Sequence, residues 1–518
     1  MPAWLQIRPQ VVHVLHGNGT PASASHYYYY RCCTIYEKGA EIIRMQHTLL
    51  GGETYRKATD LYFERYDGHA VTCDDFVQCM ADASGRSMEQ FFLWYKQPGT
   101  PTLTVTCHYN ETNYNYALTF KQKQEDTPGQ YDKKPLLIPI AVGLLDAEGN
   151  EIQATQVLEM AEREQTFLFT DIKSRPIPSI LRSFSAPVKL VTDLSDDDLR
   201  LLQLHDTDGF NQWEAGQTLA LRAIEKVMAD EDADISEFVD DLGILIAQGL
   251  AKKGDKALLA RALTLPSIPV ISQSQTVIDP AAMDKARTHI LKAIKRTHKP
   301  ALTKLYKANG NTGEFSLTPA AMGRRALQNV TLELLTATNG TGCATLAKTH
   351  YDNADNMTDR IAALASLTDS TKPEREVVFA DFYNRYKDYP LVVDKWFTMQ
   401  SMANRNAMLD DFASLRQHLD FNIKNPNRVR ALYSSFAMNN PVKFHDPSGK
   451  GYAILRDVIV ELNAINPQIA SRLVTPLREW KRYTPALQAH MKAALQVILD
   501  TPNLSNDVFE LVSKCLKG

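Results

Sequence analysis

Hydrophobic and polar positions change their spacing twice along the chain. In residues 36–95 hydrophobic residues recur at intervals of three and four, as at Ala58, Leu61 and Tyr62. This interval places them on one face of a helix. We therefore expect short amphipathic helices in this part, separated by glycine-containing turns.

From about Thr102 the interval between hydrophobic residues becomes two. Leu103, Val105 and Cys107 alternate with threonines, which predicts a strand with one buried face. Short strands separated by Pro, Gly and Asp turns over roughly a hundred residues indicate an immunoglobulin-like β-sandwich. The other alternating runs lie at 114–120, 166–169 and 187–191.

Beyond these strands amphipathic helices follow to the end of the chain. Ser195 and Asp198 have the spacing of a capping box, which predicts the start of a helix. Phe238 and Leu242 then lie on one helix face. The length of this region, residues 201–518, predicts a helical superhelix, although no repeat of fixed period is visible.

Length and charge agree with a large folded protein. The chain has 518 residues, and at roughly 100 to 200 residues per domain this predicts about three domains. The fold class is therefore multidomain α+β, with boundaries near residues 96 and 200. Lys and Arg number 57 and Asp and Glu 60, so no strong field favours nucleic acid or a membrane surface as a partner.

Cysteine content and the start of the sequence predict a cytoplasmic location. Seven cysteines are sparse for this length, and Cys32 and Cys33 are adjacent, so a reduced compartment is the simpler interpretation. The first residues lack the pattern of a signal peptide, and the most apolar run, 135–145, is too short to cross a bilayer.

No metal-binding signature is present in the sequence. None of the 13 histidines is followed by Glu and no two are four residues apart, so the chain contains no H-E-x-x-H. His13 and His16, the nearest pair, have no carboxylates beside them. Cys73 and Cys79 fit small buried hydrophobes better than ligands. Residues and spacing alone thus predict no self-sufficient active site.

A basic segment, residues 287–307, allows two interpretations. Its lysines and arginines could bind an anion, or they could form a solvated helix face while Leu291, Ile294 and Leu302 turn inward. The second interpretation is favoured, because charge runs on amphipathic helices are usually solvated.

At Tyr36-Glu37-Lys38-Gly39-Ala40 the sequence begins to resemble a known family, the bacterial-type alanyl aminopeptidases (aminopeptidase N). The resemblance covers residues 36–518. Further motifs similar to that family follow in the same order: Leu61-Tyr62-Phe63-Glu64-Arg65, Cys73-Asp74-Asp75-Phe76, Gly99-Thr100-Pro101, Phe184-Ser185-Ala186-Pro187-Val188, Asn356-Met357-Thr358-Asp359, Asp394-Lys395-Trp396-Phe397, Asn425-Pro426-Asn427-Arg428 and Asn466-Pro467-Gln468-Ile469.

The resemblance implies a zinc exopeptidase that removes N-terminal residues from peptides, with a broad preference for alanine. Residues 1–95 would then be the helical end of a thermolysin-like catalytic domain, with residues 1–35 irregular. Residues 96–200 would be the β-sandwich, and residues 201–518 the helical superhelix that closes over the active site.

Four site residues follow from the resemblance. Tyr36 matches a tyrosine that donates a hydrogen bond to the oxyanion of the tetrahedral intermediate, a role that suits a neutral phenol. Arg428, Gln468 and Arg472 match positions on the helical domain that face the peptide. Gln468 and Arg472 are four apart, so a helix would present both on one face. Hydrogen bonding between helices remains the alternative for these three.

The chain departs from the family in two ways. The H-E-x-x-H helix and the third zinc ligand, a glutamate, would precede Tyr36 and are absent, so we expect no zinc bound to this chain and no activity of the chain alone. Residues 10–33 resemble nothing in the family, and Arg31 stands where it has a second tyrosine. We expect a truncated or mis-assembled start.

Two functions therefore remain open from the sequence. The chain could be the C-terminal part of an aminopeptidase, with peptides and the missing N-terminal catalytic half as partners. It could instead be a non-catalytic scaffold that binds peptides or proteins. In either case we expect apolar faces around Ile43, Leu61 and Phe91 to be exposed, because a partner lobe is missing.

Overall fold

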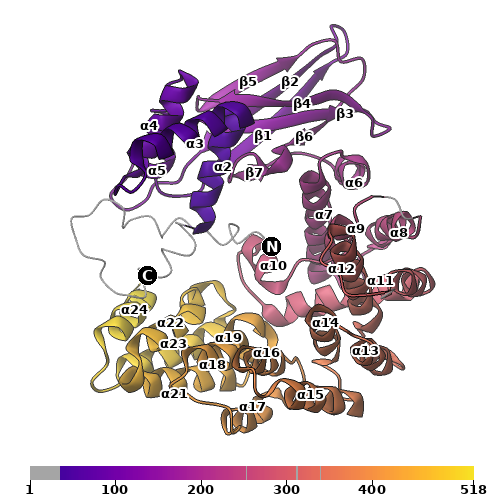
Figure 1. The fold of residues 1–518 in the computed structure, drawn as a ribbon, viewed down its shortest axis with the longest axis vertical. Coiled ribbons are helices and arrows are strands. Elements are labelled where there is room, and N and C mark those ends of the chain that lie inside the picture. Colours follow the sequence, from indigo (N-terminus) through magenta and orange to yellow (C-terminus); the bar gives the residue numbers. More distant parts are fainter. Residues whose placement is uncertain (1–35, 252–253, 311–312, 339, 518) are drawn as a thin grey trace. The chain divides into compact units, whose positions relative to one another are not determined.

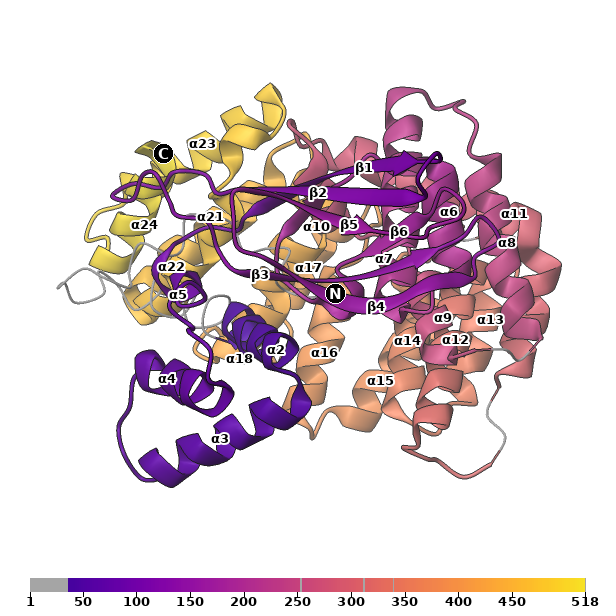
Figure 2. The same ribbon diagram turned by 90° about the horizontal axis from the view of Figure 1, so that it is seen from above.

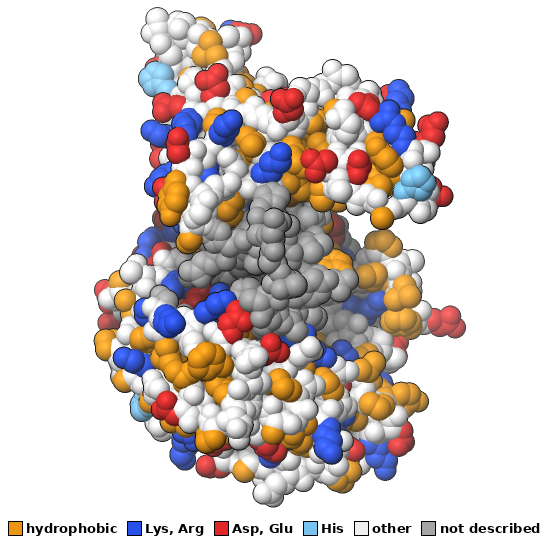
Figure 3. Space-filling view, turned by 90° about the vertical axis from the view of Figure 1, so that its left-hand side faces the viewer, with side chains coloured by type: hydrophobic (Ala, Val, Ile, Leu, Met, Phe, Trp, Pro, Cys, Tyr) orange, Lys and Arg blue, Asp and Glu red, His pale blue; other side chains and the backbone are white. Residues whose placement is uncertain are grey.

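The computed structural model describes residues 36–251, 254–310, 313–338 and 340–517. It divides into two compact units, Met1–Leu219 and Ala220–Gly518, and each is described by itself. Among the described helices, none is both long enough and apolar enough to cross a bilayer. Figure 3 shows acidic, basic and hydrophobic side chains interspersed on one face, as the balanced composition predicts.

The described part of the first unit, which starts at residue 36, begins with four α-helices gathered at one end of a β-sandwich (Figure 1). A capping box starts α4, where Thr72 accepts from the Asp75 amide and the Asp75 side chain accepts from the Thr72 amide. The helices predicted from the spacing of three and four are confirmed. Their bounds are α2 Gly39–Leu50, α3 Gly52–Tyr66, α4 Cys73–Ser84 and α5 Leu93–Lys96.

Seven strands form the two sheets of the sandwich. One sheet has the order β5-β2-β1-β7 and the other β4-β3-β6. β1 pairs antiparallel with β2 and parallel with β7. The four predicted alternating runs are confirmed as β1, β2, β5 and β7. The bounds are β1 Thr102–Asn110, β2 Asn115–Lys123, β3 Ile138–Leu145, β4 Glu151–Met160, β5 Glu164–Phe169, β6 Ile177–Ile180 and β7 Lys189–Val191.

The strand β3 occupies the apolar run that the sequence pattern left unassigned. Every residue of β3 is buried. It is the central strand of its sheet, and α2 and the short helix η4, Arg182–Phe184, pack against it. A strand covered on both faces shows no polar alternation, which is why period-two spacing did not reveal it.

The helical region starts with α6, Asp196–His205, and α7, Gly209–Ala229. The predicted capping box is confirmed: the Ser195 side chain accepts from the Asp198 amide, and the Asp198 side chain accepts from the Ser195 amide, both at 3.1 Å. Acidic residues in the first turn also meet the positive end of the helix dipole.

The second unit is a succession of helices, seen from above in Figure 2. Phe238 and Leu242 are buried, as their spacing predicts. The bounds are α8 Ser236–Leu250, α9 Lys256–Ala262, α10 Ile268–Ser274, α11 Pro280–Ala308, α12 Pro319–Thr336, α13 Cys343–Asp352, α14 Met357–Leu367, α15 Pro373–Tyr386, α16 Pro390–Ser401, α17 Met408–Arg416, α18 Pro426–Val429, η5 Arg430–Ser434, α19 Ser435–Asn439, α20 Pro441–Phe444, α21 Lys450–Ile465, α22 Pro467–Leu473, η6 Thr475–Leu477, η7 Trp480–Arg482, α23 Pro485–Leu499 and α24 Asn506–Lys517.

Some sequence expectations about burial are confirmed and others are wrong. On α11, Leu291, Ile294 and Leu302 are buried beneath the basic face, and Cys79 is buried. Cys73, the first residue of α4, is exposed. Phe91 is also buried rather than exposed, because the segment after α4 packs into the core of the sandwich.

Candidate functional site

Tyr36 lies in the turn that leads directly into α2. Its side chain is 58% exposed. Below it, α2 buries Ile42, Met45 and Leu49 and packs against β3 and β4. The phenol is therefore presented on the surface of the first unit, at the start of a helix whose opposite face belongs to the core.

Two cations on the same stretch of chain donate to backbone carbonyls of the sandwich, one in the loop before β1 and two in η4. The buried Lys38 ammonium donates to the Gly99 carbonyl at 3.1 Å, and burial lowers the pKa of Lys38 to about 8. Arg44 donates to the carbonyls of Ser183 and Phe184. Sequence reasoning quoted Lys38 within the Tyr36 motif but gave neither Lys38 nor Arg44 a role.

Arg428 is buried inside the helical unit. Its Nε donates to Asp394 Oδ1 at 2.7 Å, and its other nitrogens donate to the carbonyls of Asp420 and Pro390. The guanidinium also lies over the Phe397 ring, 4.8 Å from the centroid. These contacts are those of the packing alternative, and the peptide-binding role of Arg428 stays a prediction.

Gln468 and Arg472 both lie on α22, as their spacing predicts. Gln468 is exposed and Arg472 is partly buried. This helix packs against α21 and α24, whereas Arg428 contacts α16. The peptide-binding role of Gln468 and Arg472 likewise stays a prediction.

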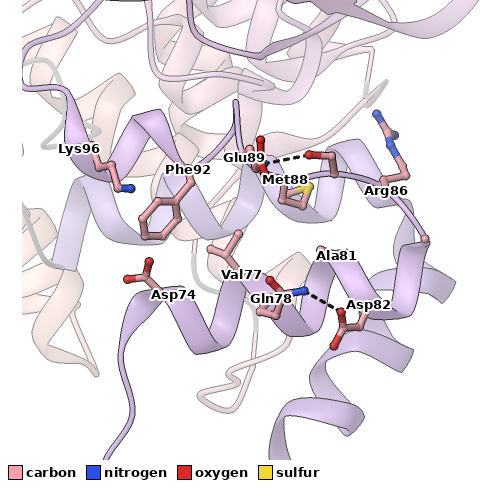
Figure 4. Close-up of a pocket in the computed structure, with 12 residues that line it drawn as sticks. Asp74, Val77, Gln78, Ala81, Asp82, Arg86, Met88, Glu89, Phe92 and Lys96 are labelled. Carbon is pink, nitrogen blue, oxygen red and sulfur yellow. Dashed lines mark hydrogen bonds between the residues drawn. The ribbon is translucent and has the colours of Figure 1, made fainter.

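A cavity of about 710 Å³ lies between α4 and the segment that follows it (Figure 4). Hydrophobic side chains such as Val77 and Phe92 form part of its lining, and Asp74 and Lys96 lie near one end. None of the four predicted site residues lines it. Some of its charged groups already have partners: Asp82 accepts from Gln78 at 2.7 Å and pairs with Arg65.

A second cavity, of about 280 Å³, lies in the helical unit. The Asn404 amide donates to Asp369 at 2.6 Å, and its side chain donates to Asp284 at 3.2 Å. Burial raises the pKa of the Asp284 carboxyl. Sequence reasoning missed this group because its members are far apart in the chain and match no motif.

The described residues do not fit a zinc centre. Across residues 36–517, apart from the gaps named above, no three His, Cys, Asp or Glu side chains lie together as a metal site requires. His13, His16, Cys32 and Cys33 lie outside the described residues. No step of chemistry can be derived through zinc from the side chains described.

Comparison with protein-family models divides the chain into three matched regions. Residues 196–517 match a domain of unknown function with ARM repeats, DUF3458_C. Residues 99–193 match a domain of unknown function with an Ig-like fold, DUF3458, and residues 20–95 match the Peptidase family M1 domain. The expectation that residues 10–33 resemble nothing in the family is therefore wrong for residues 20–33. The immunoglobulin-like sandwich and the helical repeat architecture expected from the sequence are thereby confirmed.

Similar proteins are aminopeptidases. Aminopeptidase N from Caulobacter vibrioides is 43% identical over 93% of the chain, and aminopeptidase N from Escherichia coli is 38% identical over the same share. A crystal structure of Legionella pneumophila aminopeptidase A in complex with aspartic acid superposes with a TM-score of 0.85 at 29% identity, covering 98% of this chain and 60% of that one.

The similarity accounts for only part of each relative. The chain covers 56% of the length of the two aminopeptidase N sequences, and it corresponds to their C-terminal portion. Because the helical-domain model matches more than half of the chain and these relatives align with nearly all of it, the chain belongs to the aminopeptidase N family of M1 peptidases.

Proposed function

We propose that this chain supplies the oxyanion-stabilising tyrosine and the helical domain of a zinc aminopeptidase that removes N-terminal residues from peptides. The observation that carries the proposal is the alignment of 93% of the chain with aminopeptidase N at 43% identity. The exposed position of Tyr36 at the start of α2 supports it, since an oxyanion donor must be free to meet a substrate.

The proposal also specifies the substrate preference, the location and the cofactor of the complete enzyme. We propose a broad preference for alanine, a cytoplasmic location, and zinc as the cofactor of the complete enzyme. The chain alone is inactive in this proposal, because its sequence contains no H-E-x-x-H to bind zinc and to provide a general base. Its partners are peptides and an N-terminal catalytic half.

The first experiment measures the purified chain alone. We expect no stoichiometric zinc by metal analysis and no hydrolysis of alanine p-nitroanilide. Stoichiometric zinc together with turnover that EDTA abolishes would overturn the proposal that the chain alone is inactive.

The second experiment supplies the other half. The N-terminal portion of the Caulobacter vibrioides relative, mixed with this chain, should give hydrolysis that EDTA abolishes. Tyr36→Phe in this chain should then lower kcat roughly a hundredfold, the usual effect of removing one oxyanion donor. Tyr66→Phe, on the neighbouring helix α3, is the matched control. Equal activity of the Tyr36→Phe and control mixtures would contradict the role of Tyr36.

A non-catalytic scaffold is the second candidate. It is favoured by the core of the helical unit, which buries Phe382, Phe397, Phe436 and Phe444 among its own helices. A titration with alanine-rich peptides tests it, with Gln468→Ala and Arg472→Ala as variants. Saturable binding that both substitutions weaken would support a scaffold, and its absence would remove this candidate.

A further inference from the structure

We propose that Lys38 and Arg44 are positioning residues for Tyr36, which fix the entry and the second turn of α2 to backbone carbonyls of the loop before β1 and of η4. The inference rests on the proposed function, in which Tyr36 stabilises an oxyanion. According to this inference, contacts with the sandwich hold that tyrosine in position.

The first attachment is made by Lys38, two residues after Tyr36. Its side chain is 6% exposed and its ammonium donates to the Gly99 carbonyl, with the Trp94 ring centroid 6.0 Å away. Lys133, also buried, donates to the adjacent Pro98 carbonyl at 2.8 Å. Two ammonium groups thus hold successive carbonyls of the loop between α5 and β1.

The second attachment is made by Arg44, two turns further along α2. Its two terminal nitrogens donate separately to the carbonyls of Ser183 and Phe184, and its guanidinium lies 5.2 Å from the Phe184 ring centroid. Glu41, one turn earlier, accepts from Nε at 2.8 Å. This fork can hold two carbonyls in fixed directions, which a lysine cannot do.

The turn that accepts Arg44 has an unusual and well-supported backbone. Leu181, Ser183 and Phe184 have φ values of 60°, 54° and 52°, although none is glycine. Asp208 fixes the turn by accepting from the Ser183 amide and hydroxyl, both at 2.9 Å. Non-glycine residues keep such a conformation only where surrounding contacts determine it. Arg44 is therefore attached to a firm support.

These attachments bear on Tyr36 because α2 is one continuous helix from Gly39 to Leu50. Lys38 fixes its entry and Arg44 fixes its second turn, so the turn that carries Tyr36 has little freedom to shift relative to the sandwich. An oxyanion donor needs such a fixed position, since its hydrogen bond must meet the charge at about 2.7–3.1 Å.

Hydrogen exchange on the full chain tests the attachments directly. Lys38→Met and Arg44→Gln should each raise amide exchange in residues 36–50 roughly tenfold or more, because each substitution removes at least one hydrogen bond made by a charged group. The helical unit should be unaffected. Lys57→Ala, which removes an exposed pair with Glu53 on α3, is the control and should change nothing in residues 36–50. Unchanged exchange in both variants would overturn the inference.

Activity of the mixture with the N-terminal portion of the Caulobacter vibrioides relative separates positioning from general destabilisation. Each variant should lower kcat roughly tenfold with KM unchanged, and Arg44→Lys should recover part of the loss. In the Tyr36→Phe background neither variant should lower kcat further, because both act through the phenol. A full additional loss there would overturn the inference. If the mixture shows no activity, the proposed function fails, and hydrogen exchange still decides this inference.

Discussion

At the scale of single residues, buried cations in this chain depend on backbone carbonyls as well as on carboxylates. Arg428 illustrates the rule, since it combines an ion pair with Asp394 and donation to the carbonyls of Asp420 and Pro390. Such a cation holds several segments together. Its removal leaves a carboxylate and carbonyls without their donor.

Arg428→Ala should therefore lower the free energy of unfolding of the chain by about 3 kcal/mol, the usual cost of breaking a buried ion pair from one side. Gln468→Ala, at an exposed position on α22, should change it by less than about 0.5 kcal/mol. Urea denaturation followed by circular dichroism measures both values. A small loss for Arg428→Ala would remove the packing interpretation and favour a role in binding.

His445 makes the stability of the helical unit depend on pH. Its Nδ1 lies 2.7 Å from the Tyr452 hydroxyl and its ring stacks on Tyr483, and burial lowers the pKa of His445 to about 3. Between this value and the unfolded pKa of about 6.5, the unfolded state binds the extra proton, so stability falls as pH falls.

The expected loss from this histidine is about 2 kcal/mol between pH 7 and pH 5. His445→Gln keeps a hydrogen-bond acceptor but does not titrate, so its stability should fall less over the same range. Urea midpoints at the two pH values, compared between the original and the variant chains, measure the difference. Parallel losses in the two chains would show that His445 is not responsible.

The sequence predicted functional roles for residues only where a family motif pointed to them. Tyr36, Arg428, Gln468 and Arg472 were named in this way, and none of these roles has yet been tested. The attachments of Lys38 and Arg44 could not be predicted, because every residue has a carbonyl and the acceptors lie 61 and about 140 residues away. Sequence pattern carries no signal for a side chain that reaches backbone.

At the scale of elements, the sheet that contains β3 depends on a close approach between this strand and an arginine. A Cβ at Gly143, in β3, would lie 2.2 Å from Arg182 Cζ. Arg182 is buried, pairs with the fully buried Asp206 at 3.0 Å and donates to Ser179 at 2.8 Å. Glycine at position 143 therefore provides the space that this ion network occupies.

Gly143→Ala should consequently lower the free energy of unfolding of the first unit by about 3 kcal/mol or more, because the methyl group displaces Arg182 from Asp206. Gly52→Ala is the matched control. A Cβ there would meet only His47 at 3.5 Å, and alanine is the better helix former. Thermal unfolding monitored by circular dichroism compares the two. Equal stability of both variants would contradict the importance of this contact.

Hydrophobic spacing predicted well the elements that have one buried and one solvent-exposed face. It did not predict strands that are buried on both faces. The alternation in β1 follows its burial, with Leu103 and Val105 inside and Thr104 and Thr106 outside. β3 gave no such signal because it is covered on both sides. The strand β4 has nearly all of its residues outside the core, so hydrophobic spacing did not mark it either.

At the scale of the whole molecule, the first unit presents a helix with little buried surface. Only Ala58 is buried among the fifteen residues of α3, and Phe63 is 63% exposed. Ile43 on α2 is exposed as well, as the sequence predicted. Exposed apolar residues of this size favour self-association.

Phe63→Glu should reduce self-association of the purified chain without changing its unfolding temperature, since the side chain contributes little to the core. Phe509→Glu, at a similarly exposed position on α24, is the control and should leave association unchanged. Light scattering over a concentration series measures the effect. Unaltered association of the Phe63→Glu chain would show that α3 is not the surface responsible.

The length of the chain and the changes in hydrophobic spacing along it predicted a multidomain protein, because each part has its own spacing of hydrophobic residues. Hydrophobic spacing gave no signal for the position at which the two compact units divide. This position lies within α7, after residue 219, and not at the change from strands to helices. The reason lies in tertiary contacts. Asp206 pairs with Arg182 and Asn211 donates to Ser179, and these four residues, which come from separate parts of the sequence, form one polar core.

That polar core determines where the chain can be truncated to produce separate fragments for crystallisation or spectroscopy. A sandwich fragment ending at residue 200 would retain Arg182 and its pair with Glu151 but lose Asp206, the fully buried carboxylate of this network. A fragment extended to residue 219 keeps the charge pair and Asn211 together. Expression yield and solubility of the two fragments should therefore differ, although both contain every strand.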